Sequence, residues 1–341
     1  MQMNAAEVRE LRDRWNVGKY KDLLDAIKGA LPEDEWVPLC DSLPHVLDGS
    51  PTIDLRGASL PDTKLANLDL SYSHLAFATF DGAQFDEVGF QYAILDGVSF
   101  KRCGFHLAQM LPVYGAGVDF RHARFRQSFI EHAKLSNSDL SGVTMAEGSL
   151  NSSELVECNF SGVLAERNEW RWNTTTRCDF VATRFVECRL TASRFDAARL
   201  TDAVFENCEM SGVDFRGADL TGVRFLGGTF GDVQQGETTF RTRFDDTPEA
   251  RRVVAAGSTE NQLAVEWCPV TSGSSEPVRP NASAKLKARP GDVVPQSGWW
   301  VSPALGSEQG RRYFNAGERF PDIKSTNWGL VIWSYNPTDQ G

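Results

Sequence analysis

Large apolar side chains recur at every fifth position between residues 53 and 233. From residue 55 to residue 230 there are 36 such positions, here called centres, and all but Gly115, Ala165 and Thr175 carry a large apolar residue. The positions two residues before the centres hold small side chains such as Ala78 and Val98. A period of five matches neither the helix nor the strand. We therefore expect the chain to turn a corner in every repeat and to close a square with four repeats.

Two segments show the repeat most clearly, Ile-Asp-Leu-Arg-Gly at residues 53–57 and Ala-Asp-Leu-Thr-Gly at residues 218–222. They resemble the motif of the pentapeptide-repeat family, which runs small–Asp/Asn–Leu/Phe–polar–Gly. The resemblance implies a mainly β fold, a right-handed quadrilateral β-helix with twenty residues in each coil. Stacked at the spacing of neighbouring strands, the repeats make about nine coils and a rod roughly 40 Å long. Because each coil buries its apolar side chains only against its neighbours, both ends need caps.

Residues 1–50 are predicted to form a helical cap for the first end of the rod. Val8, Leu11 and Trp15 are spaced three and four residues apart, which places them on one face of a helix. A second apolar stripe lies between residues 20 and 31, and Pro32 is followed by acidic residues, as at the start of a third helix. A separate partner-binding role for this segment is the alternative.

The repeat ends near residue 233, so we expect the rod to span residues 51–235. Residues 236–262 are polar and are predicted as a connection, with a short helix at residues 250–256. Residues 263–341 are predicted to form a small aromatic-rich β domain, because short apolar segments alternate there with turn residues. Within it, residues 297–300 and 311–318 resemble a module of bacterial toxin-immunity proteins.

The formal net charge is −11, and residues 51–235 hold 24 acidic and 17 basic side chains. Direct binding of nucleic acid is not expected, since it needs lysine and arginine to displace counterions. A basic protein partner suits this charge better. No run of 18 apolar residues indicates a membrane span. The charged N-terminus lacks the apolar core of a secretory signal, so the cytoplasm is the expected location.

Residues that commonly carry catalysis are scattered. The five histidines are dispersed, and His122 and His132 fall on opposite walls of a four-sided coil. No phosphate-binding glycine loop, nucleophile elbow or zinc-finger cysteine spacing is present. Five of the seven cysteines occupy the small inward column, where free cysteine packs like a small apolar residue; a buried metal or disulfide is the alternative. We expect a non-enzyme without cofactor or metal.

Candidate binding residues lie where the repeat looks disturbed, at residues 163–177. Trp170 stands at a centre, and Trp172 stands two residues later at an outward position. Tryptophan is common at binding hot spots, so both are candidates for partner contact. The alternative is that Trp172 folds back over a bulged coil.

Acidic side chains flank this segment. Four of them follow centres on one wall and are predicted to form an acidic ridge that guides a basic partner: Glu147, Glu166, Glu187 and Glu206. A solvated face that prevents aggregation is the alternative. In the C-terminal domain, Trp299 and Trp300 are the next candidates for a binding surface, or else part of a compact core.

Two classes of function follow from these features. The first is an immunity protein that binds and neutralises a bacterial toxin, such as a basic nuclease domain, since the rod is acidic and the C-terminal module resembles immunity proteins. The second is implied by the family resemblance: some pentapeptide-repeat proteins mimic duplex DNA and protect topoisomerases. A plain interaction scaffold is a third alternative. The sequence leaves the oligomeric state open.

Overall fold

The computed structural model describes residues 5–18, 21–22, 24–25, 53–260 and 262–270, together with residues 287–288, 294, 298–301, 311–315, 317–319, 321, 325–326, 329–330 and 333–336. The chain divides into two compact units. One comprises residues 15–276 and contains the repeats. The other comprises residues 1–14 and 277–341.

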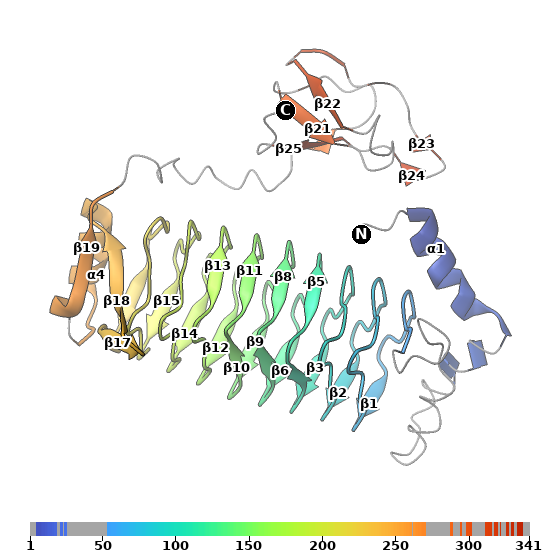
Figure 1. Ribbon diagram of the computed structural model, residues 1–341, viewed down its shortest axis with the longest axis horizontal. Helices are drawn as coiled ribbons and strands as arrows, with labels where there is room; N and C mark the ends of the chain where they lie inside the picture. Colours follow the sequence, from blue (N-terminus) through green and yellow to red (C-terminus); the bar gives the residue numbers. More distant parts are fainter. Residues whose placement is uncertain are drawn as a thin grey trace. The chain divides into compact units, whose positions relative to one another are not determined.

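The repeats form a parallel β-helix in which strand residues pair with those twenty positions later, as Phe85 does with Phe105 (Figure 1). Wall A is a nine-stranded sheet of short strands, one from each coil. The strands are β1 (Lys64–Ala66), β2 (Gln84–Asp86), β3 (Gly104–His106), β6 (Arg124–Arg126), β9 (Thr144–Ala146), β12 (Leu164–Glu166), β14 (Arg184–Val186), β15 (Val204–Glu206) and β16 (Arg224–Leu226).

Each coil continues through three more walls. Wall B includes β4 (Gln109–Met110), β7 (Phe129–Glu131) and β10 (Ser149–Asn151). Wall C includes β5 (Tyr114–Ala116), β8 (Lys134–Ser136), β11 (Glu154–Val156) and β13 (Thr174–Thr176). Wall D is held by single parallel bridges such as that between Asp119 and Asp139. The stacked coils confirm the predicted fold class.

The centres fill the inside of the tube. Phe85, Phe105 and Phe125 stack along wall A, with successive ring centroids 4.8 and 4.5 Å apart. The small column also points inward, and several of its polar members donate to carbonyl groups of the preceding coil. For example, Asn168 Nδ2 lies 2.8 Å from the carbonyl oxygen of Met145. Most buried polar groups of this column are thereby satisfied, as a packed core requires; Ser73 Oγ is an exception.

Nearly every corner is turned by the second residue after a centre, which adopts a left-handed backbone; the corner at Pro112 instead contains a cis peptide bond. The φ angle is 50° at Arg167 and 70° at Gly222. This conformation costs an L residue roughly 1–2 kcal/mol and costs glycine little. The stacking of the coils overcomes that cost wherever a corner carries a side chain. The side chains at the corners point outward.

Residues 163–177 are regular, so the predicted disturbance was wrong. Strands β12 and β13 pair in register with the coils beside them. Trp170 points inward and its ring centroid lies 5.1 Å from that of Phe185, the residue in register with Ala165. Ala165 and Thr175 are also buried. The two small centres compensate in volume for one oversized centre, and no bulge forms.

The first end of the rod is closed by Trp15 and Leu24, both buried in the same core as Leu55. Helix α1 (Ala5–Asp13) leads into the short helix η1 (Arg14–Asn16), and residues 21–22 and 24–25 are helical. Trp15 Nε1 donates to the carbonyl oxygen of Arg56 at 2.9 Å. The third helix predicted at residue 32 lies outside the described residues.

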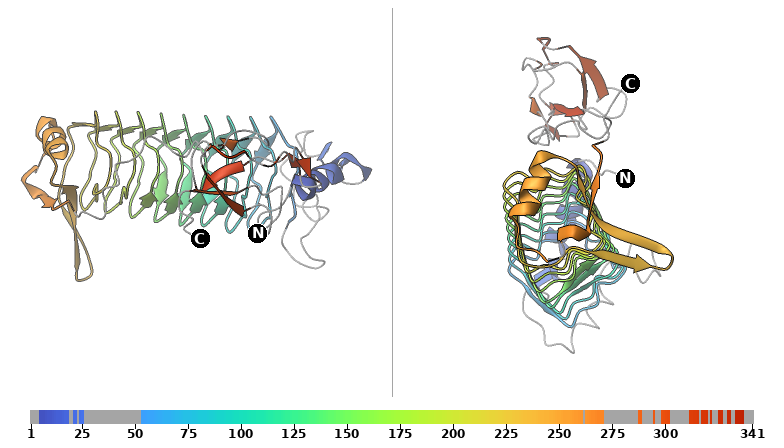
Figure 2. Two further views of the ribbon diagram at one scale, coloured as in Figure 1. Left: turned by 90° about the horizontal axis from the view of Figure 1, so that it is seen from above. Right: turned by 90° about the vertical axis from the view of Figure 1, so that its left-hand side faces the viewer.

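The second end is closed by residues that we expected to form a connection and the start of a separate domain. Strands β17 (Asp232–Gln235) and β18 (Thr238–Asp245) form a hairpin that projects from the last coil (Figure 2). The end of β18 pairs with β19 (Val265–Cys268), which follows the short helix η3 (Gln262–Ala264). Phe244 is buried and stacks on Phe215 at 4.8 Å, so it continues the centres of wall C.

Helix α4 (Pro248–Ala256) covers the end of wall A, packing on β16 with Val253 and Val254 buried. Its N-cap Thr247 accepts a hydrogen bond from the backbone N–H of Ala250, and Pro248 opens the first turn. The short helix expected at residues 250–256 is therefore present, but as part of a cap and not of a linker.

The other unit carries the β structure predicted for the C-terminal region. A four-stranded antiparallel sheet has the order β20-β25-β21-β22, and β23 pairs with β24. The strands are β20 (Lys287–Ala288), β21 (Gly298–Val301), β22 (Arg311–Phe314), β23 (Ser325–Thr326), β24 (Gly329–Leu330) and β25 (Trp333–Asn336).

Candidate functional site

Large apolar side chains are exposed on walls B and C near the first end of the rod. Tyr72 and Tyr92 occupy successive left-handed corners between the two walls, and their rings stack with centroids 4.9 Å apart. Ile94 and Tyr114 follow on wall C, paired across adjacent coils. All four are exposed, and we call them the aromatic face. Contiguous exposed apolar groups commonly mark interaction sites.

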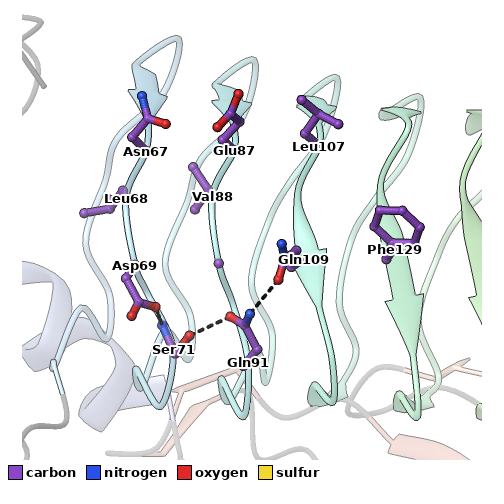
Figure 3. A pocket seen from close by; sticks show the side chains of 11 residues that line it. Asn67, Leu68, Asp69, Ser71, Glu87, Val88, Gln91, Leu107, Gln109 and Phe129 are labelled. Carbon is purple, nitrogen blue, oxygen red and sulfur yellow. Dashed lines mark hydrogen bonds between the residues drawn. The ribbon is translucent and has the colours of Figure 1, made fainter.

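A groove of about 480 Å³ lies on wall B beside the aromatic face (Figure 3). Gly89 forms its floor, because it is the one position in that part of the outer column without a side chain. Glu87 and Leu107 follow one edge, Ser71 and Gln91 follow the other, and the exposed ring of Phe129 stands at the end toward the middle of the rod.

The polar edge of the groove is held by hydrogen bonds between coils. Ser71 Oγ donates to Gln91 Oε1 at 2.6 Å, and Gln91 Nε2 donates to Gln109 Oε1 at 2.9 Å. Asp69 Oδ1 accepts from the backbone N–H of Ser71 at 2.9 Å. Side chains already fixed in this way lose little conformational freedom when a partner binds.

Two acids of the groove differ from most acids of the rod. Elsewhere, many carboxylates form ion pairs with basic side chains of the same or the adjacent coil, as Glu157 does with Arg177 at 2.9 Å. Among the described residues, no ion pair involves Asp69 or Glu87, and the groove lining contains no basic side chain. The groove therefore combines unneutralised negative charge with apolar walls.

The predicted site residues near residue 170 do not form an open surface. Trp170 is 1% exposed, so its assignment to a partner contact was wrong. Its size and apolar ring placed it in the core, as at the other centres. Trp172 lies outward as expected but is only partly exposed, because its ring packs edge-to-face on Phe240 of β18 at 5.0 Å. Trp172 thus anchors the projecting hairpin, and it does not plug a bulge.

The four predicted ridge acids lie along one edge of wall A, but arginines interrupt them. Arg167 pairs with Glu147 at 3.1 Å, and Arg184 pairs with Glu206 at 3.1 Å. The hydrogen bond from Arg167 to Glu147 and the charges of Glu147, Glu166 and Glu187 raise the pKa of Arg167. Arginine thus pairs with two of the four acids, and the ridge has a weaker field than four free carboxylates would have.

Trp299 and Trp300 lie on β21, in register with Tyr313 and Arg312 of β22. The structure describes their backbone, and their part in binding stays a prediction. Within the described ranges, no three His, Cys, Asp or Glu side chains come together as metal ligands. No helix there is long and apolar enough to cross a membrane.

The repeats match known families over much of the rod. Residues 63–102, 116–142 and 130–162 match the family described as "Pentapeptide repeats (8 copies)". Residues 173–240 match "Pentapeptide repeat region". The chain belongs to the pentapeptide-repeat family. Among curated proteins, none matches the sequence.

Solved structures of pentapeptide-repeat proteins match about half of the chain at low identity. HetL, a pentapeptide repeat protein involved in heterocyst differentiation regulation from the cyanobacterium Nostoc, is 15% identical over 52% of this chain and 90% of its own, with a TM-score of 0.26. Trypsin-treated QnrB1, a plasmid-mediated fluoroquinolone resistance protein, is 22% identical over 51% of this chain and 87% of its own, with a TM-score of 0.28. At these values the likeness says nothing about partners.

The aromatic face and the groove of this pentapeptide-repeat rod were missed in the sequence. The centres alone show a period of five, whereas outward neighbours on one wall recur every twenty residues. In that longer register Tyr72 stands next to Tyr92, and Gly89 stands between Asp69 and Gln109. Sorting the outward residues by wall is the signal that would have found both features.

Proposed function

We propose that the chain is a non-enzymatic protein-binding protein of the cytoplasm, an immunity protein that binds and neutralises a bacterial toxin. The observation that carries this proposal is the aromatic face beside the groove. Tyrosine is enriched at protein interfaces, where one ring buries a large area with little loss of side-chain freedom. Burying one such exposed ring contributes about 2 kcal/mol, so two tyrosines and their neighbours supply a sufficient anchor.

Charge favours a basic toxin, such as a nuclease domain. The chain has a formal net charge of −11, and opposite charge on the partner speeds encounter. A nuclease needs basic side chains to hold phosphates. An immunity protein that covers them blocks substrate binding by occupying the same surface. The resemblance of residues 297–300 and 311–318 to immunity modules supports this reading.

Co-expression tests the proposal directly. A candidate toxin, encoded by a gene adjacent to the gene of this chain, is expressed in a bacterium together with increasing doses of the wild-type chain. Growth should recover only near equal amounts of the two proteins, because binding consumes one chain per toxin. Recovery at a strongly substoichiometric dose would point instead to an enzyme that turns over.

Two variants test whether the toxin contacts the aromatic face of the rod. Tyr92→Ala should weaken toxin binding by about 2 kcal/mol, as loss of a hot spot does. Leu226→Ala is the matched control, since Leu226 is a similarly exposed apolar residue on wall A in the last coil. Equal losses in the two variants would refute the assignment of the face. Protection of a topoisomerase from inhibition without any rescue from the toxin would refute the immunity role.

A further inference from the structure

We infer that the groove on wall B receives an arginine or lysine side chain from the partner protein, with an apolar side chain of the same segment seated against Phe129. This inference rests on the proposed protein-binding function and names the chemistry of the segment that binds. It comes from comparing two parts of one outward column on wall B, in which each residue lies directly beside the residue twenty positions away.

The part of that column near the second end is an ion-pair ladder. Arg189 is bridged between Glu169 and Glu209 of the neighbouring coils. Its guanidinium nitrogens lie 3.3 Å from a carboxylate oxygen of Glu169 and 3.5 Å from one of Glu209. The backbone geometry of wall B therefore suits a cation held between acceptors on the two adjacent rungs.

The part near the first end has the same arrangement without its cation. The backbone of Gly89 lies between those of Asp69 and Gln109 in the adjacent coils, in the same way as the backbone of Arg189 lies between those of Glu169 and Glu209. Asp69 offers a carboxylate, Gln109 offers an amide oxygen, and Glu87 adds a second carboxylate from the edge of the groove. A guanidinium or ammonium group entering above Gly89 would occupy the place that Arg189 fills elsewhere from within the chain.

The apolar end of the groove sets the spacing of the partner segment. Phe129 stands two coils beyond Gly89 in the same column, a distance of roughly 10 Å at the spacing of neighbouring strands. A peptide in the polyproline II conformation advances about 3.1 Å per residue and returns a side chain to the same face at every third residue, so the apolar side chain lies about three residues from the basic one. Leu107 narrows the groove between these two positions.

The chain supplies its own filling variants and a matched control. Gly89→Thr places a side chain on the floor, and the same column tolerates threonine at Thr229. A Cβ at position 89 meets the flexible end of Gln91 at 2.6 Å, so the fold should survive. Gly89→Arg supplies the missing cation from within the chain. Gly104→Thr is the control, since Gly104 holds the equivalent position on wall A.

The experiment selects dodecapeptides from a random library on the full-length wild-type chain. Selected peptides should carry a basic residue about three positions from an apolar one. A synthetic peptide of that sequence should bind the wild type and Gly104→Thr alike. Asp69→Asn, and replacement of the peptide's arginine by citrulline, should each weaken binding by about tenfold or more, as loss of a hot-spot contact does. Gly89→Thr and Gly89→Arg should abolish binding.

Several results would overturn the inference. They are selection of peptides without basic residues, unchanged affinity with citrulline, and unchanged affinity in Gly89→Thr. Self-association of the wild type that Gly89→Thr abolishes would assign the groove to a second copy of the chain instead.

The toxin assay separates this inference from the proposed function. Full rescue by Gly89→Thr would refute the groove as the toxin contact and leave the immunity role standing. Absence of rescue by the wild type, combined with groove-dependent peptide binding, would refute the immunity role alone.

Discussion

Replacing both Trp170 and Ala165 by leucine should restore an ordinary coil, although Ala165→Leu alone should destabilise the rod. Trp170 fills space beyond its own wall and reaches Phe185, the residue in register with Ala165. Removal of the large ring leaves a cavity, and a leucine at residue 165 has no room while the ring is present. Together, the two changes exchange volume inside one coil.

The magnitudes follow from the structure. Trp170→Leu should lose about 2–3 kcal/mol from the cavity. Removing the indole also stabilises the folded state by about 1–3 kcal/mol, because Trp170 Nε1 is a buried donor without an acceptor in the described part of the chain. Ala165→Leu should cost about 1–3 kcal/mol by overpacking. The double variant should lie within about 1 kcal/mol of wild type, so the two changes should couple by about 2 kcal/mol.

Urea denaturation of the wild type, the two single variants and the double variant measures this coupling. A control cycle combines Ala165→Leu with Phe105→Leu, which lies three coils away on the same wall and should be additive. Additive losses in the Trp170 cycle, within about 0.5 kcal/mol, would show that the coil does not exchange volume in this way.

Three further predictions concern the core and the projecting hairpin. Phe125→Asp places an unpaired charge in the core at a cost of several kcal/mol, so a cooperative melt near that of wild type would contradict the packing described here. Trp172→Ala removes the contact with Phe240 and should speed hydrogen exchange at residues 232–245; unchanged exchange there would mean that the hairpin is anchored elsewhere. Burial raises the pKa of the Cys103 thiol to about 12, whereas the unfolded thiol ionises near 8.5. Its contribution to stability is therefore complete below about pH 8.5 and is lost as the pH rises toward 12. The free energy of unfolding should fall less steeply between pH 9 and about 11 in Cys103→Ala than in wild type, and equal slopes would contradict this assignment.

The rod could be predicted from the sequence because one packing rule repeats in every coil. A large centre and a small residue two positions earlier are both buried, so their period survives every change on the surface. Sequence reasoning failed where volume is shared between walls. Ala165 and Trp170 looked like a disturbance because each was judged alone, whereas Phe185 brings the two walls into contact.

The caps and the binding surface were harder to predict. Phe244 continues the centre column of wall C. Because of the hairpin before it, however, Phe244 comes fourteen residues after the centre Phe230, and fourteen is not a multiple of five. A fixed period cannot show this. The groove depends on a missing side chain at Gly89, and an absence has no signal until its neighbours in space are known. The four acids of the predicted ridge lie along one wall, but Arg167 and Arg184 alter the field there.

Because the chain turns a corner in each five-residue repeat, the wall on which an outward side chain lies is set by its residue number, and residues twenty apart lie on the same wall. Deleting five residues from the middle of the rod, such as 136–140, would join the centre Leu135 to Ser141, which followed the deleted centre, and would keep the five-residue phase of the interior. Every side chain beyond the cut would, however, turn by one wall relative to the groove and the aromatic face. The hairpin at residues 232–245 would then face a different direction. In such a protein, a small deletion acts as a rotation, and the fold can keep its stability while its surface is rearranged.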